Sequence, residues 1–88
     1  MELIKFSQNA CRPCGELDQF LEHGLGVEPD KVYILDGGDD SHLEEAGKYG
    51  IMNTPVLILL DDNNKEIDRV IGTDREEVTA IVEKRGLI

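Results

Sequence analysis

Hydrophobic and polar residues follow one another along the 88 residues in two periods, one typical of strands and one typical of helices. Short apolar or alternating runs predict strands at residues 3–7, 32–35, 56–60 and 66–71. Apolar residues three and four positions apart predict helices that begin near Cys11, Ser41 and Thr73. The predicted order is therefore strand, helix, strand, helix, strand, strand, helix.

The predicted helices have recognisable ends and inward faces. Gly24 and Gly26 are expected to end the first helix, and Gly86 the third. Two capping boxes are predicted to open the other two helices, Ser41 with Glu44 and Thr73 with Glu76. The residues expected to face the core are Leu17, Phe20, Leu21 and Leu25 in the first helix, Leu43 and Ala46 in the second, and Val78, Ile81 and Val82 in the third.

The strands differ in polarity, which predicts their places in a sheet. Residues 56–60 are uniformly apolar, which is typical of a central strand covered on both faces. Residues 32–35 also predict a buried strand, whereas residues 66–71 are more polar and favour an edge. Two βαβ-like crossovers followed by a hairpin predict an α/β fold: a mixed four-stranded sheet with helices on both faces. We expect a single domain, residues 1–88.

The composition is acidic, with 19 aspartates and glutamates against 9 lysines and arginines and a formal charge of −10. Such a charge disfavours nucleic acid and anionic membrane surfaces as partners. No apolar run reaches the roughly 20 residues that span a membrane, and no basic region precedes an apolar N-terminal stretch. We therefore expect a cytoplasmic protein, in a reducing compartment where close cysteines are more often reactive or metal-binding than permanently bridged.

Cys11-Arg12-Pro13-Cys14 contains the only two cysteines of the chain. A disulfide between residues so close constrains the unfolded chain little, so it would stabilise the fold poorly. At a helix start, free N–H groups and the helix dipole favour a thiolate at Cys11, Arg12 adds positive charge, and Pro13 is tolerated. We expect Cys11 to ionise below about pH 7.5 and to act as the nucleophile, with the less exposed Cys14 as the resolving thiol.

Two other interpretations of the cysteine pair stay open. Half of a zinc site would need two further ligands, and only His23 and His42 are available, neither in a recognisable ligand pair. In the other interpretation, the cysteines are two inert small residues. The redox interpretation requires no metal and no organic cofactor.

A second segment, Tyr49-Gly50-Ile51 followed by Thr54-Pro55, makes the interpretation of the cysteine pair more specific. With it, the chain resembles the thioredoxin superfamily over essentially its whole length, and in size it is similar to the short forms that phages encode. Members have a CxxC between the first core strand and helix, a cis-proline before the third core strand, and a glycine after the last strand, here Gly72. The resemblance implies a dithiol–disulfide oxidoreductase that reduces protein disulfides.

The resemblance also implies how a substrate is held and which partners act. The Thr54–Pro55 peptide would be cis and face the cysteines. The Thr54 backbone would then pair with an extended substrate segment, with Ala10 beside it. Recycling by a thioredoxin reductase and targets such as ribonucleotide reductase are what the family suggests, and we expect a monomer.

Three positions depart from the thioredoxin pattern. Ala10 and Arg12 stand where the usual Trp-Cys-Gly-Pro-Cys has tryptophan and glycine. Lys5 stands where thioredoxins have a buried aspartate that helps to deprotonate the second thiol. We therefore expect Lys5 and Arg12 to tune the acidity of the thiols in a way that differs from ordinary thioredoxins.

Two alternative functions follow from the same resemblance. The chain has the length of a glutaredoxin, in which Lys48, Thr54 and Asp74 would have to form a cradle for glutathione. The charge of −10 disfavours that anionic ligand. The third possibility is a non-enzymatic adaptor of the same fold, whose dithiol senses the redox state.

Overall fold

The computed structural model describes all residues, 1–88, and contains four strands and three helices in the predicted order. A π-helical turn, η1, continues the first helix. The elements are β1 Glu2–Ser7, α1 Arg12–Gln19, η1 Phe20–Leu25, β2 Lys31–Ile34, α2 Asp40–Lys48, β3 Val56–Leu60, β4 Glu66–Ile71 and α3 Arg75–Arg85.

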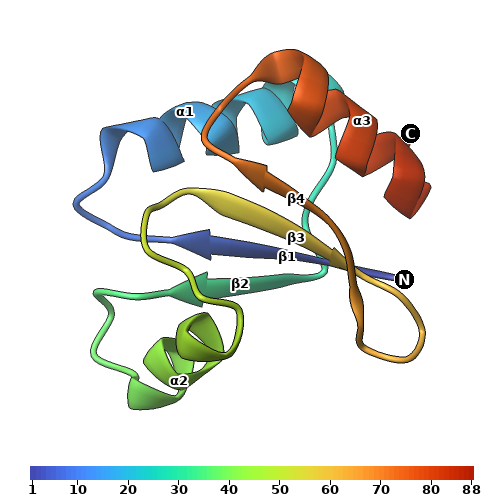
Figure 1. Ribbon diagram of the computed structural model, residues 1–88. Helices are drawn as coiled ribbons and strands as arrows, with labels where there is room; N and C mark the ends of the chain where they lie inside the picture. The colour runs from blue at the N-terminus through green and yellow to red at the C-terminus, as the bar shows by residue number, and fades with distance from the viewer.

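The four strands form one sheet in the order β2-β1-β3-β4. β1 and β2 are parallel, whereas β3 is antiparallel to both β1 and β4. Helices α1 and α3 lie over one face of the sheet and α2 lies over the other (Figure 1). The predicted mixed sheet with helices on both faces is therefore confirmed.

Alternate side chains of the central strands divide between two cores. In β1, Leu3 faces the side of α1 and α3, whereas Ile4 and Phe6 face α2, as the period of two in a strand requires. All five residues of β3 are buried, so its expected central position is confirmed. The larger core consists of Leu3, Leu17, Leu21, Val27, Leu57, Leu59, Val70, Val78, Ile81 and Val82.

The second crossover differs from the prediction of two βαβ-like units. Only β1, α1 and β2 form a parallel unit, because β3 runs antiparallel to β1. β2 ends where Ile34 lies opposite Ser7, and β3 begins where Val56 lies opposite Phe6. The segment that contains α2 therefore begins and ends at the same end of the sheet. This return places Thr54, just before β3, in contact with Cys11, just before α1.

The expectation of a buried strand at residues 32–35 is wrong. β2 is an edge strand, and Val32 is exposed. The predicted edge position of β4 is confirmed. Apolar residues in a short run do not reveal how many neighbours the strand has, and here the strand order leaves β2 with β1 alone.

Two of the predicted helix ends are also wrong. The side chain of Asp39, not Ser41, caps α2, and that of Asp74, not Thr73, caps α3. Aspartate is at least as good a cap as serine or threonine. The Asp39 carboxylate accepts from the N–H of Ser41, and the Asp74 carboxylate accepts from the N–H of Glu77. Leu43 is exposed, contrary to expectation, because α2 turns only its Ala46 side to the sheet. The remaining predicted inward residues are buried or partly buried.

Candidate active site

Cys11 and Cys14 form a disulfide at the point where the chain leaves β1 and enters α1. Cys11 is the N-cap of α1, and the backbone N–H of Cys14 donates to Cys11 Sγ over 3.2 Å. Cys14 lies one turn further on and is only 2% exposed, whereas Cys11 is partly exposed. The helix N-terminus therefore directs its free N–H groups at the more accessible of the two sulfur atoms.

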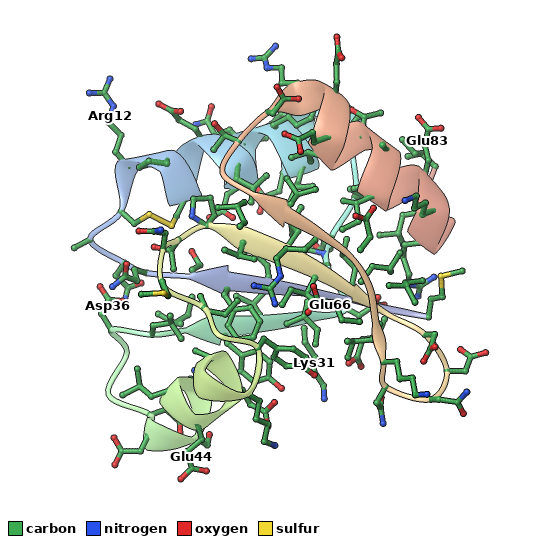
Figure 2. The ribbon with its side chains drawn as sticks, in the orientation of Figure 1. Arg12, Lys31, Asp36, Glu44, Glu66 and Glu83 are labelled. Carbon is green, nitrogen blue, oxygen red and sulfur yellow. A yellow bond between two sulfur atoms is a disulfide. The ribbon has the colours of Figure 1, made fainter.

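The two residues between the cysteines play different parts. Pro13 occupies the first turn of the helix, where its missing N–H removes no hydrogen bond. The side chain of Arg12 is 92% exposed and extends away from the disulfide into solvent (Figure 2). Its nearest carboxylate is Glu16, with Arg12 Nε 3.8 Å from Glu16 Oε1. Arg12 therefore contributes positive charge at the rim, not a contact to sulfur.

The loop before β3 lies against the exposed sulfur. The Thr54–Pro55 peptide is cis. Cys11 Sγ is 3.9 Å from the carbonyl oxygen of Thr54 and 3.5 Å from its hydroxyl oxygen. That hydroxyl donates to Gln8 Oε1 over 2.6 Å, and Gly72 N–H donates to the Pro55 carbonyl over 3.0 Å. Three segments that are distant in the sequence therefore meet near Cys11: residues 8–11, Thr54–Pro55 and Gly72.

The carboxylate of Asp36 holds the loop that leads to Cys11. Asn9 N–H donates to Asp36 Oδ1 over 2.6 Å, and Ala10 N–H donates to Oδ2 over 3.0 Å. Asp36 follows β2, so it ties the end of that strand to the segment before the cysteines (Figure 2). The hydrogen bond from Ala10, followed by that from Asn9, lowers the pKa of Asp36 below 3.8, because both stabilise the charged form.

Replacing Asp36 by asparagine is expected to lower the stability of the protein at neutral pH but not in acid. A carboxyl whose pKa is lower in the folded state contributes stability above its unfolded pKa, here 3.8, and loses it as the pH falls through the folded pKa. Urea unfolding of the wild type and of Asp36→Asn at pH 7, and at pH values below 3.8, measures this difference. A difference in unfolding free energy that stays constant over that range would show that the Asp36 carboxylate does not stabilise the loop through these hydrogen bonds.

An ion pair with a buried ammonium and a partly exposed carboxylate lies beneath the helix that carries the cysteines. Lys5 is only 7% exposed and points to the α1 side of the sheet, where its Nζ contacts Asp18 Oδ1. Asp18 is four residues after Cys14, so the two side chains project from the same side of α1. The cation at the position of the family's buried aspartate is therefore neutralised by an acid from the helix.

Other candidates from the sequence lie away from the disulfide or have other partners. His23 is exposed in η1, and His42 packs against Tyr33 with its Nδ1 3.1 Å from Ile34 N. The Lys48 ammonium donates to Glu45 over 2.8 Å, and Asp74 caps α3. Thr54 is the one member of the expected glutathione cradle that contacts Cys11.

Sequence reasoning missed Asp36, Gln8 and Asp18. The spacing of four between Cys14 and Asp18 is a signal that was available, since such residues share a helix face. The sequence held no such signal for Asp36 or Gln8. The partners of Asp36 are 26 and 27 residues away in the sequence, and the partner of Gln8 is 46 residues away.

The positions of the two sulfur atoms indicate which reaction the site can carry out. One sulfur is accessible at a helix N-terminus, a second is buried one turn later, and a free backbone carbonyl faces the first. Sulfur atoms so placed exchange disulfides through a mixed disulfide and then resolve it internally. The protein is a dithiol–disulfide oxidoreductase with a thioredoxin fold.

Comparison with known proteins agrees with this class. The chain is 30% identical over 84 residues to the SPbeta prophage-derived thioredoxin-like protein YosR of Bacillus subtilis, an alignment that covers 96% of this chain and 98% of that protein. It is 35% identical over 85 residues to thioredoxin of Chlamydia pneumoniae, covering 96% of this chain and 81% of that protein. The chain therefore belongs to the thioredoxin family. No family model matches it.

Solved structures lead to the same fold. Thioredoxin of Malassezia sympodialis (Mala s 13) superimposes with a TM-score of 0.70 at 25% identity, over 93% of this chain and 71% of that one.

No helix of the protein has the length and apolar character needed to cross a bilayer.

Proposed function

We propose that residues 1–88 act as a single-domain, monomeric, cytoplasmic reductase of protein disulfides. The observation that supports this most is the unequal exposure of the two sulfur atoms. Only Cys11 is accessible to a folded protein substrate, whereas Cys14 is buried one turn behind it. Such a pair suits a nucleophile and a resolving thiol.

The reaction then proceeds in two exchanges. In the reduced protein, the Cys11 thiolate attacks one sulfur of the substrate disulfide, and the other substrate sulfur leaves as a thiolate that takes a proton from solvent. Cys14 loses its proton and attacks Cys11 Sγ, which releases the second substrate sulfur. The substrate gains two electrons, and the protein ends as the Cys11–Cys14 disulfide described above.

Substrate binding is assigned to the backbone next to the disulfide. The Thr54 carbonyl, 3.9 Å from Cys11 Sγ, suits pairing with an extended substrate segment by strand addition. Pro55 keeps that backbone turned toward the cysteines, and Ala10 leaves open the side where the family has a tryptophan. Lys5 and Arg12 are proposed to tune thiol acidity, Lys5 through its ion pair with Asp18 and Arg12 through its exposed charge.

The electron donor is proposed to be a thioredoxin reductase, with ribonucleotide reductase among the targets. Family membership supports reductase-type donors in general. A glutathione-dependent reaction is less favoured, because Lys48 pairs with Glu45 and Asp74 caps a helix.

One pair of assays separates the three functions. We expect reduction of insulin disulfides with NADPH and thioredoxin reductase, and little with glutathione, glutathione reductase and NADPH. Turnover in the glutathione system alone would identify a glutaredoxin. Absence of turnover in both, with Cys11→Ser still binding its partners, would identify a redox-sensing adaptor.

A further inference from the structure

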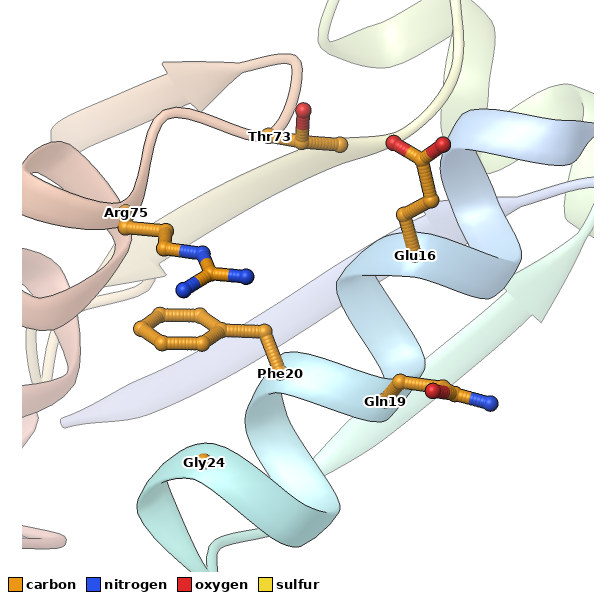
Figure 3. A pocket seen from close by; sticks show the side chains of 6 residues that line it. All are labelled: Glu16, Gln19, Phe20, Gly24, Thr73 and Arg75. Atoms are coloured by element: carbon orange, nitrogen blue, oxygen red, sulfur yellow. The ribbon is translucent and has the colours of Figure 1, made fainter.

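A groove of about 600 Å³ lies next to the active site, between α1–η1 on one side and the start of α3 on the other (Figure 3). Its lining residues are Glu16, Gln19, Phe20, Gly24, Thr73 and Arg75. Thr73 directly follows Gly72, whose N–H donates to the carbonyl of Pro55. The groove therefore adjoins the loop that carries Thr54 and Pro55.

The floor of the groove is an aromatic ring held between a glycine and a guanidinium. A Cβ atom on Gly24 would lie 2.6 Å from Cδ1 of Phe20, so the ring occupies space that only glycine leaves free. On its other side, Cζ of Arg75 is 5.2 Å from the ring centroid, and the guanidinium lies over the ring (Figure 3). The π-helical turn that starts at Phe20 brings Gly24 under the ring.

Arg75 has no carboxylate partner, which is unusual in a chain with 19 acidic residues. Of the nine lysines and arginines, seven lie within 4.0 Å of a carboxylate oxygen, which leaves two, Arg75 and Lys65. Lys65 lies in the turn between β3 and β4, away from the groove. Because a guanidinium that stacks on a ring keeps its edge N–H groups free, Arg75 presents donors in the geometry that a carboxylate accepts.

We propose that this groove binds the substrate polypeptide on one side of its target disulfide, and that Arg75 holds a carboxylate side chain of that segment. The proposal rests on the proposed function, since it names the substrate feature that the same site selects. Phe20 offers apolar contact to the segment, and Gln19 and Thr73 offer polar contacts. Glu16 on the opposite wall confines an acidic side chain to the Arg75 side by like-charge repulsion.

The test uses peptides with one internal disulfide, in which glutamate, glutamine or lysine is moved through the positions on either side of the cysteines. Their reaction with the reduced protein is followed as kcat/KM at low and high salt. At one position we expect the glutamate peptide to react about fivefold faster than the glutamine peptide, with the preference falling as salt rises. Arg75→Gln should remove the preference, so that the glutamate and glutamine peptides react at equal rates, and Arg75→Glu should shift the preference to lysine.

Two further variants make the result specific. Lys65→Gln alters the net charge by the same amount and should keep the preference for glutamate. Gly24→Ala should lose that preference, because its Cβ displaces the Phe20 ring, while the helix tolerates alanine well.

The outcomes decide between the alternatives. A wild type with no preference at any position, or a preference that survives in Arg75→Gln, would overturn the proposal. If Arg75→Gln slows only the reduction of glutathione mixed disulfides, the groove holds glutathione and the proposal is wrong. Failure to reduce any disulfide peptide would refute the proposed function, and this proposal with it.

Discussion

Replacing Cys14 by serine is expected to abolish turnover and to leave one equivalent of substrate bound to Cys11 as a mixed disulfide. Cys11 is partly exposed and caps α1, so it still attacks the substrate disulfide. The serine hydroxyl cannot displace sulfur, and the second exchange stops. Mass spectrometry of the reduced variant after mixing with a disulfide peptide, under non-reducing conditions, measures the adduct.

The matched control is Cys11→Ser, which is expected to form no adduct and to show turnover at the background level. Its remaining cysteine, Cys14, is 2% exposed and out of reach of a peptide disulfide. An adduct on Cys14 in this variant, or none on Cys11 in Cys14→Ser, would reverse the assigned roles or refute them. Circular dichroism spectra of both variants confirm that the fold is retained.

The second large effect is expected at the Lys5–Asp18 ion pair, where replacing one partner should lower the stability far more than replacing the other. Asp18→Ala leaves the Lys5 ammonium, with a side chain only 9% exposed, without a partner. We expect a loss of about 3 kcal/mol in the free energy of unfolding. Lys5→Met instead leaves the Asp18 carboxylate, which is 42% exposed and turns to water, so the loss should be below about 1 kcal/mol. Urea unfolding at pH 7 measures both.

An exposed pair of the same type provides the control. Lys48 and Glu45 on α2 are 2.8 Å apart, with the lysine side chain 66% exposed. Glu45→Ala should therefore lower the free energy of unfolding much less than Asp18→Ala does, because the Lys48 ammonium stays in water. Equal losses for Asp18→Ala and Lys5→Met would show that burial of the ammonium does not control the effect.

Much of the fold could be predicted because its signals are local. The uniformly apolar β3 and the helical spacing in α1 and α3 depend on a few neighbouring residues each. The errors arose where neighbours in space matter more than neighbours in sequence. The exposure of Val32 follows from the edge position of β2, and that of Leu43 from the fact that α2 turns only its Ala46 side to the sheet.

By itself, the sequence determined the order of the elements and the chemistry at the cysteines. A CxxC at a helix start is complete within four residues, so its N-cap geometry and the burial of Cys14 follow from local structure. Only the tertiary structure decided what surrounds Cys11. Thr54 lies 43 residues away in the sequence, and it reaches Cys11 because β3 runs antiparallel to β1 from the same end of the sheet. Strand direction and order depend on the packing of the whole chain, and local periodicity does not encode them.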